Sequence, residues 1–174
     1  MASSRRPLPV ADVGNALRAQ YGQDLVDVAD RGGHAVVTIA PARYRELVTV
    51  LRDDPDFDCD YFDFLSAVDF PEANELELVV HLYSNAHNHH VRVKVRIPRD
   101  DARVDTIHDI YAGANWAERE CWELFGIVFE GHPHLVKLVL PEPFEGHPLR
   151  KDFELMSRVA KPWPGEAEGE EVEE

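Results

Sequence analysis

The chain has 174 residues, of which 44% are hydrophobic and 29% charged, a composition typical of one soluble globular domain with its own core. No apolar run approaches the roughly 18 residues that a membrane-spanning helix needs, and the N-terminus lacks the apolar stretch of a secretory signal, so we expect a cytoplasmic protein. The net charge of -15 argues against nucleic acid and anionic lipid as general partners, because phosphate binding requires clustered Lys and Arg.

The elements of the first half follow from residue spacing. Residues 9–20 predict a short helix, and residues 34–40, rich in β-branched side chains, predict a strand. Pro41 then opens an amphipathic helix whose apolar stripe lies within residues 44–51. Residues 57–70 are strongly apolar and aromatic, and their pattern fits a buried helix or a buried strand equally well.

The clearest local pattern is an alternation of inward and outward residues over 76–83 and again over 91–97. This alternation predicts an antiparallel hairpin with one face in the core. The outward face of the second strand is basic, and Glu75 and Glu77 lie on the first strand, so we expect cross-strand charge pairs. The predicted fold class is α/β (α+β), a mostly antiparallel sheet with a prominent hairpin, flanked by short helices.

The second half begins with a short helix predicted at residues 105–111. Asn115 then begins a longer helix, and Glu118 three residues later is expected to complete a capping box, in which each side chain accepts a free backbone N–H of the first turn. Gly126 ends that helix. Two further strands are predicted, at residues 127–129 and 135–140.

Beyond residue 141 the many prolines and glycines predict an irregular, extended chain. We divide the sequence into a domain of residues 1–153 and an extended Pro-rich and acidic tail of residues 154–174, which ends with six glutamates in its last nine positions. Such a tail has too little apolar surface to order by itself. Trp163, flanked by prolines, is a suitable anchor for a groove on a partner.

Two cysteines, Cys59 and Cys121, lie far apart and form no CxxC motif. The count argues against a disulfide framework, a zinc knuckle or an iron–sulfur cluster held by this chain. Cys121 falls on the apolar face of its helix, which favours a packed thiol over a nucleophile. Any redox centre would therefore belong to a partner.

Histidines are the strongest candidates for metal chemistry, because neighbouring imidazoles bind zinc or nickel. The run His87, His89 and His90, with His81 upstream, is such a group, although a polar hairpin loop explains the same residues and is favoured. A second group lies in Pro-rich turns and is interpreted as structural; it consists of His132, His134 and His147.

Charged residues on the predicted helix from Asn115 are the candidates for acid–base catalysis. Glu118, Glu120 and Glu123 could form paired carboxylates. Arg119 lies between them, which favours a network of ion pairs over a catalytic site. No P-loop, GxGxxG turn or nucleophile elbow is present in the sequence.

Five short segments together resemble one known family. They are Gly113-Ala-Asn-Trp116, Glu118-Arg-Glu120, Leu124-Phe-Gly-Ile127, Phe129-Glu-Gly-His-Pro133 and Gly146-His-Pro-Leu-Arg-Lys-Asp-Phe153. Their order and spacing resemble the signature of the C subunit of respiratory NADH:quinone oxidoreductase (complex I), the 30 kDa subunit family. The sequence departs from the usual pattern at Cys121-Trp122 and at Lys137, where Arg is common.

The resemblance implies a cofactor-free structural subunit of the peripheral arm, beside the D subunit that forms the quinone site and near the cluster-bearing subunits. It implies that FMN, iron–sulfur clusters and quinone are bound by partner subunits, and that this chain meets the membrane only through the complex, on the cytoplasmic side of the bacterial plasma membrane. No catalytic, cofactor-binding or metal residue is then expected here. The partner-interface candidates are Glu118, Arg119, Glu120, Glu123, His132, His147, Arg150, Lys151 and Trp163.

Three alternatives stay open at this point. One is the equivalent subunit of a membrane-bound hydrogenase or of a ferredoxin- or F420-linked complex, which shares the scaffold but has another electron donor. Another is an independent metal-binding protein that uses the histidines at positions 81 to 90. The last is a hydrolase that uses the paired glutamates.

Overall fold

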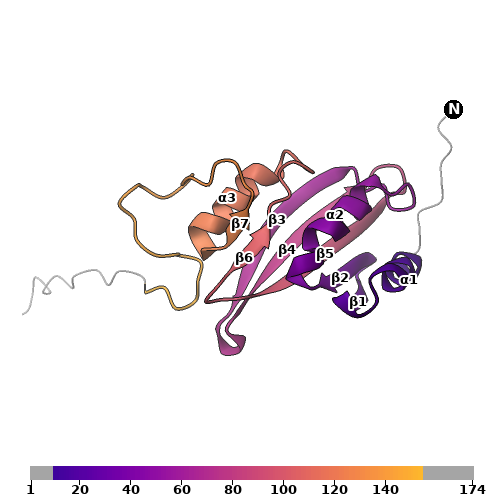
Figure 1. Ribbon diagram of the computed structural model, residues 1–174, viewed down its shortest axis with the longest axis horizontal. Coiled ribbons are helices and arrows are strands. Elements are labelled where there is room, and N and C mark those ends of the chain that lie inside the picture. The colour runs from indigo at the N-terminus through magenta and orange to yellow at the C-terminus, as the bar shows by residue number, and fades with distance from the viewer. Residues whose placement is uncertain (1–9, 155–174) are drawn as a thin grey trace, which may run out of the picture.

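The computed structural model describes residues 10–154. A five-stranded sheet runs through it, and Figure 1 shows α2 and α3 lying in front of that sheet. The helices and strands are α1 (Val10–Tyr21), β1 (Leu25–Arg31), β2 (His34–Ile39), α2 (Tyr44–Asp53), β3 (Tyr61–Phe70), β4 (Glu75–Ser84), β5 (His89–Pro98), β6 (Arg103–Asp105), α3 (Ala114–Phe125) and β7 (Val128–Glu130).

The large sheet has the strand order β1-β2-β5-β4-β3. All neighbouring strands are antiparallel except β2 and β5, which pair in parallel, and the short strands β6 and β7 form a separate parallel pair. The predicted mixed fold with a mostly antiparallel sheet is therefore confirmed. The ambiguous residues 57–70 contain the strand β3, which pairs with β4 over its whole length.

The hairpin of β4 and β5 supplies the centre of the core. Leu76, Leu78, Val80 and Leu82 have no exposed surface, and they face the helices because alternate residues of a strand point to opposite sides. Full burial of each such side chain contributes about 1.5–3 kcal/mol. On the opposite face Glu77 accepts hydrogen bonds from Lys94 and Arg96, which confirms the predicted cross-strand charge pairs.

A tight turn at Gly32 and Gly33 joins β1 to β2, and it places His34 at the start of β2. Both glycines have positive φ, 67° and 82°, the backbone conformation that a two-residue hairpin turn requires. The strand β1 was not expected from the sequence, because its residues include two aspartates and an arginine within Leu25–Arg31. Its pairing with β2 rather than its own pattern makes it a strand.

One predicted helix is wrong. Residues 105–111 contain the end of β6 and a turn in which Ile110 and Tyr111 donate their backbone N–H groups to the carbonyl of Ile107. β6 forms because Arg103–Asp105 pairs with Val128–Glu130, a partner far along the chain. None of the helices within residues 10–154 has the length and apolar character needed to cross a membrane. The predicted tail, except residue 154, and Trp163 lie outside the described residues.

Candidate functional site

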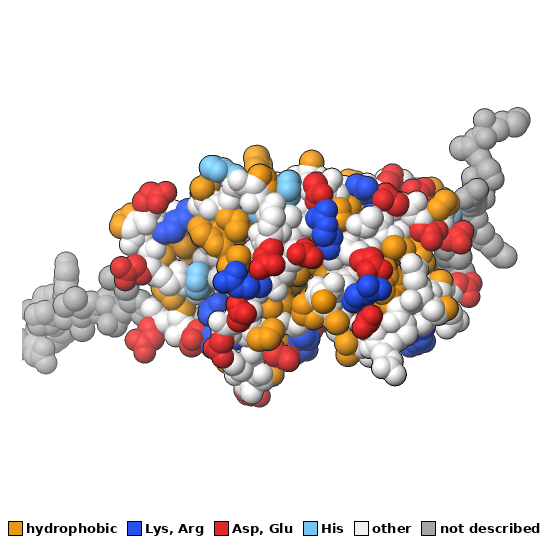
Figure 2. Space-filling view, viewed as in Figure 1, with side chains coloured by type: hydrophobic (Ala, Val, Ile, Leu, Met, Phe, Trp, Pro, Cys, Tyr) orange, Lys and Arg blue, Asp and Glu red, His pale blue; other side chains and the backbone are white. Residues whose placement is uncertain are grey.

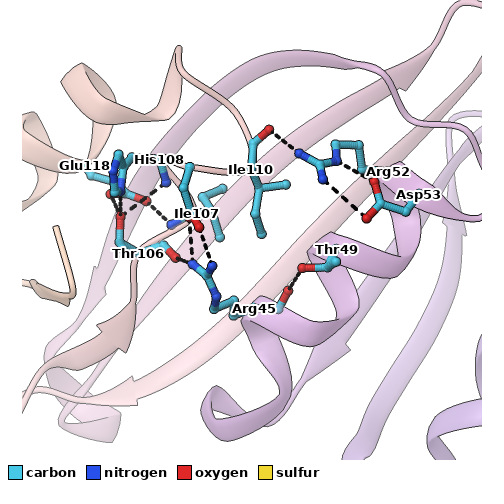
Figure 3. A network of polar contacts seen from close by, with 10 residues as sticks. Arg45, Thr49, Arg52, Asp53, Thr106, Ile107, His108, Ile110 and Glu118 are labelled. Carbon is cyan, nitrogen blue, oxygen red and sulfur yellow. Dashed lines mark hydrogen bonds and ion pairs between the residues drawn. The ribbon is translucent and has the colours of Figure 1, made fainter.

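The helix α3 and the segment that follows it and wraps around it, residues 126–151, carry most of the charged residues that the sequence predicted as site or interface candidates. Its residue Glu118 has no exposed surface and accepts hydrogen bonds from the Thr106 hydroxyl and, at 2.7 Å, from the backbone N–H of Ile107. Figure 3 shows Glu118, Thr106 and Ile107 at one end of this network. The predicted capping box is wrong, because α3 begins at Ala114 after Gly113 with no side-chain cap.

Burial gives Glu118 an unusual proton affinity. Removal from water raises its pKa from 4.5 to about 7, although the hydrogen bonds from Ile107 and Thr106 act in the opposite direction. The His132 Nε2 atom lies 3.9 Å from this carboxyl, and burial lowers the pKa of His132. Burial therefore shifts both the carboxyl and the imidazole toward their uncharged forms.

A shallow polar cleft lies next to this carboxyl, lined by Arg45, Asp105, Thr106, His108 and Asp109 among others. A molecule in the cleft would meet those side chains, whereas Glu118 is not part of the lining. General acid–base catalysis requires the acid to reach the reacting group. The geometry of Glu118 therefore fits an anchor for residues 106–107 better than a catalytic acid.

Two arginines of α2 bond to the loop of residues 106–110, which Glu118 also contacts, and the sequence reasoning missed both. Arg45 pairs with Asp109 and donates to the carbonyl of Thr106, while Arg52 donates to the carbonyl of Ile110 at 2.8 Å (Figure 3). The hydrogen bond from Arg45 holds the pKa of Asp109 at about 2. Their seven-residue separation on one helix, about two turns, is the signal that could have placed them on one face.

Glu123 organises the segment that follows α3. Its carboxylate accepts the backbone N–H groups of Leu138, Val139 and Leu140, at 2.9, 3.0 and 2.5 Å. Burial acts to raise the pKa of Glu123, but these three N–H groups hold it below its usual value. The strand predicted at residues 135–140 is wrong, because these N–H groups bond to a side chain instead of a neighbouring strand.

The neighbouring basic residues bond to backbone carbonyls of the same segment. Arg119 donates to the carbonyls of Val136 and Lys137, at 3.0 and 3.2 Å. The ion pairs predicted among Glu118, Arg119 and Glu123 are therefore absent from the described residues, and bonds to backbone groups take their place. Glu120 is exposed on the outer side of α3.

The second Gly-His-Pro turn closes the C-terminal end of α3. His147 Nδ1 lies 2.9 Å from the carbonyl of Glu123, and Arg150 donates to the carbonyl of Phe125 at 2.6 Å. Basic side chains at a helix C-terminus satisfy its free carbonyls and its negative dipole. Gly126 has φ 76°, and an added Cβ there would lie 2.6 Å from His147 Nε2, so only glycine fits.

The remaining interface candidates that the structure describes, His132 and Lys151, lie near the two ends of the segment that wraps α3. His132 Nε2 lies 3.3 Å from the carbonyl of Asn115, near the start of α3. Lys151 donates its backbone N–H to the buried carboxylate of Asp69 on β3, which ties the segment back to the sheet. The internal bonds found here do not test contact with a partner, so the interface assignment of these residues stays a prediction.

An apolar hollow opens where α3, β3 and the wrapped segment meet. Trp116 is 73% exposed, Val139 69% and Phe64 40%, and all three line the hollow with Leu138 and Glu120. On the face shown in Figure 2, acidic and basic side chains are interspersed. Large exposed apolar side chains that lie together are typical of surfaces that bind another protein.

The predicted histidine group is divided between the two faces of the sheet. His87 and His89 stack on each other on the core side, where His89 Nε2 lies 3.7 Å from the Cys59 thiol. His81 and His90 lie on the other side, where their rings meet His34. The four histidines therefore do not form one site, and the sequence reasoning missed His34.

Both cysteines are buried. Burial raises the pKa of Cys59 to about 12 and that of Cys121 further still, so neither thiol ionises readily. Cys121 belongs to the core, as a packed thiol should. The carboxylates that the sequence offered as a pair do not act together, because Glu118 and Glu123 each bond to a different set of backbone N–H groups.

Comparison with known proteins extends over most of the chain. Residues 37–159 match the family described as respiratory-chain NADH dehydrogenase, 30 Kd subunit. The C subunit of NADH-quinone oxidoreductase from Roseiflexus castenholzii is 36% identical over 140 residues, which are 80% of each chain. The corresponding protein of Thiobacillus denitrificans is 38% identical over 151 residues, which cover 82% of this chain and 76% of that one.

A longer relative shares the same region. The C/D subunit of NADH-quinone oxidoreductase from Serratia proteamaculans is 38% identical over 147 residues, which cover 79% of this chain and 24% of that protein. The chain therefore spans about a quarter of the length of this relative.

Solved structures agree in fold. A chain of the membrane-bound sulfane sulfur reductase, an archaeal respiratory membrane complex, matches with a TM-score of 0.65 and 25% identity over 84% of this chain and 86% of that one. The trypsin-resistant fragment of Nqo5 matches with a TM-score of 0.60 and 26% identity over 71% of this chain and 98% of the fragment. The chain therefore belongs to the respiratory-chain NADH dehydrogenase 30 kDa subunit family.

Proposed function

We propose that the chain is a cofactor-free structural subunit in the peripheral arm of a proton-translocating NADH:quinone oxidoreductase, on the cytoplasmic side of the bacterial plasma membrane. It holds the quinone-site D subunit and the cluster-bearing subunits together while electrons pass from NADH to quinone. FMN, the iron–sulfur clusters and quinone are bound by those partners. The chain performs none of the electron transfer itself.

Relatives in which the C and D subunits form one polypeptide support the choice of the D subunit as a partner. Such proteins occur in Serratia proteamaculans and Pseudomonas fluorescens, and this chain matches 24% and 25% of their lengths. Two segments joined in one polypeptide have a high effective concentration, which suits surfaces that contact each other. The separate C subunits are then expected to keep the same contact.

The cysteines support the assignment of all redox groups to other chains. Iron–sulfur clusters are held mainly by thiolates, usually four for each cluster, whereas the whole sequence contains two cysteines. Both described thiols are buried and resist ionisation. This chain therefore lacks the ligands for an ordinary cluster.

The observation that carries the proposal is that the charged side chains of α3 and of the segment after it bond within the chain, while apolar side chains beside them stay exposed. Glu118, Glu123, Arg119 and Arg150 fix the loops by bonds to backbone groups inside the chain. The apolar hollow with Trp116 is left facing outward on this rigid support. A preformed surface lined by an exposed tryptophan suits binding to another protein rather than catalysis.

The test is affinity purification of the chain from its native membrane, with the variant Trp116→Asp beside the wild type. We expect the wild type to bring down the D and cluster-bearing subunits with NADH:quinone reductase activity, and Trp116→Asp to reduce the recovered partners several-fold. Val26→Asp is the matched control, because Val26 is 70% exposed on β1 and lies outside the hollow. Recovery of the chain without partners would refute the proposal, and equal loss in both variants would remove the hollow from it.

A second function is favoured by one observation, the match to a chain of the sulfane sulfur reductase complex over 84% of this chain. We propose as the alternative the equivalent subunit of a membrane-bound hydrogenase or of a ferredoxin- or F420-linked complex. The same purification separates the two: a flavin-bearing NADH-oxidising subunit supports the first proposal, and a nickel–iron large subunit or a ferredoxin- or F420-oxidising subunit supports the second.

A further inference from the structure

Three histidines from three different strands meet on the face of the sheet opposite the leucine core. His34 begins β2, His81 lies in β4 and His90 lies in β5. One ring nitrogen of each lies within 4.8 Å of the other two. The sequence separates these residues by up to 56 positions, and the parallel pairing of β2 with β5 brings them together.

The geometry points to a binding site for a divalent transition-metal cation, with zinc as the expected ion, formed by the imidazoles of His34, His81 and His90. Neutral imidazole is the ligand that zinc, copper and nickel share. Three protein ligands leave the fourth position of a tetrahedral ion open to water or to a group from a partner. This site is independent of the proposed structural function.

Distances between the nitrogens agree with this assignment. A tetrahedral zinc ion with Zn–N bonds of about 2.0–2.1 Å places its ligand nitrogens about 3.3 Å apart. His81 Nε2 and His90 Nδ1 are already 3.1 Å apart. The third nitrogen needs a shift of at most about 1.5 Å to reach the same spacing. The His34 ring stacks on that of His90 with centroids 4.6 Å apart, so it is already placed beside the pair.

The hydrogen bonding of these rings is incomplete. Among the described residues, the Nδ1 atoms of His34 and His81 are buried and have no hydrogen-bond partner. The His81 residue is 5% exposed, so water does not readily compensate. A bound cation would satisfy ring nitrogens that the protein leaves without a partner, in a cluster where His81 is buried and His34 and His90 are half-buried.

Charged neighbours of the cluster nearly balance. The Asp63 carboxylate lies 3.9 Å from His81 Nδ1, on the side away from His90. A carboxylate at the second ring nitrogen is the usual partner of a metal-bound histidine, because it fixes the ring orientation and strengthens the ligand. Arg92, the register partner of His81, contributes one adverse positive charge. The single carboxylate offsets that cation.

The test is a titration of the full 174-residue chain, purified without a histidine tag and stripped with chelator, with Zn²⁺ in a calorimeter. We expect one Zn²⁺ per chain and a Kd raised at least about tenfold in His34→Gln and in His90→Gln, because each removes one of three ligands. Zn²⁺ should raise the Tm of the wild type and not that of His34→Gln. Co²⁺ absorption should show a four-coordinate ion in the wild type.

Two control variants define the site. His87→Gln removes a histidine of the same sequence run that lies on the other face, and His134→Gln removes an exposed histidine that does not belong to the cluster; both should bind Zn²⁺ as the wild type does. Circular dichroism of the metal-free variants checks that each is folded. If His34→Gln does not fold, the Zn²⁺ affinity of His90→Gln decides the test. Absence of stoichiometric binding overturns the inference. Binding that survives both ligand substitutions, as at the glutamate-rich C-terminal sequence, overturns it as well.

Discussion

Substitution of Glu118 by Gln should make the chain more stable at alkaline pH than the wild type. Glu118 is fully buried, and burial raises its pKa from 4.5 to about 7. Between these two pH values the unfolded chain releases the proton while the folded chain keeps it. The free energy of unfolding of the wild type therefore falls as the pH rises from about 4.5 to about 7, and it levels off above that.

The size of this effect follows from the pKa difference. At about 1.4 kcal/mol per unit, a rise from 4.5 to about 7 corresponds to about 3 kcal/mol. Gln resembles the protonated carboxyl, since its oxygen can accept the Ile107 N–H and its amide can donate to the Thr106 hydroxyl. We expect Glu118→Gln and the wild type to agree within about 1 kcal/mol at pH 5, and the variant to be up to about 3 kcal/mol more stable at pH 8.

The assay is urea unfolding of the full chain at pH 5, 6, 7 and 8, followed by circular dichroism. His81, whose pKa is lowered by burial, adds a pH dependence of the opposite sign, but it is present in both proteins and cancels in the difference between variant and wild type. Glu120→Gln is the control, because Glu120 lies on the same helix and is exposed. Parallel curves for Glu118→Gln and the wild type would refute the reasoning, as would an equal change in Glu120→Gln.

Three further substitutions test the packing around α3 and the hairpin. Glu123→Ala removes the acceptor of three backbone N–H groups, so we expect a loss of about 2–4 kcal/mol in urea unfolding and faster hydrogen exchange at residues 138–140; unchanged exchange would contradict the anchoring role. Gly126→Ala adds a close contact to the strain of positive φ and should lower the Tm more than Gly22→Ala, which adds strain alone; equal shifts would exclude the contact. Leu82→Ala should cost about 2–5 kcal/mol in urea unfolding, and a cost below about 1 kcal/mol would mean that β4 is not central to the core.

Periodicity in the sequence was enough to predict the elements whose own residues determine their state. The hairpin of β4 and β5 alternates over 76–83 and 91–97, and α2 has a complete apolar stripe, so both were correctly predicted. The apolar residues within 57–70 had no spacing that distinguished a strand from a helix, and those of β1 had no regular alternation. Both are strands because a neighbouring strand pairs with them, and pairing depends on residues elsewhere in the chain.

The charged residues of α3 were found from the sequence, but their contacts were not. Capping predicted that Glu118 would bond within its own first turn, whereas its donors lie 11 and 12 positions away, and those of Glu123 lie 15 to 17 positions away. The nearest free N–H groups in space, rather than in sequence, determined where these carboxylates point. The same N–H groups prevented residues 135–140 from pairing as a strand.

By itself the sequence determined the class of fold, the hairpin, the family signature within residues 113–153 and the shortage of cysteine ligands for a cluster. Only the tertiary structure decided which carboxylates are buried, where the apolar hollow opens, and which histidines meet. His34 joins His81 and His90 because β2 pairs in parallel with β5, and His87 and His89 are directed to the other face. Sequence patterns record the environment of a residue along its own element, while a site depends on contacts between elements that folding alone brings together.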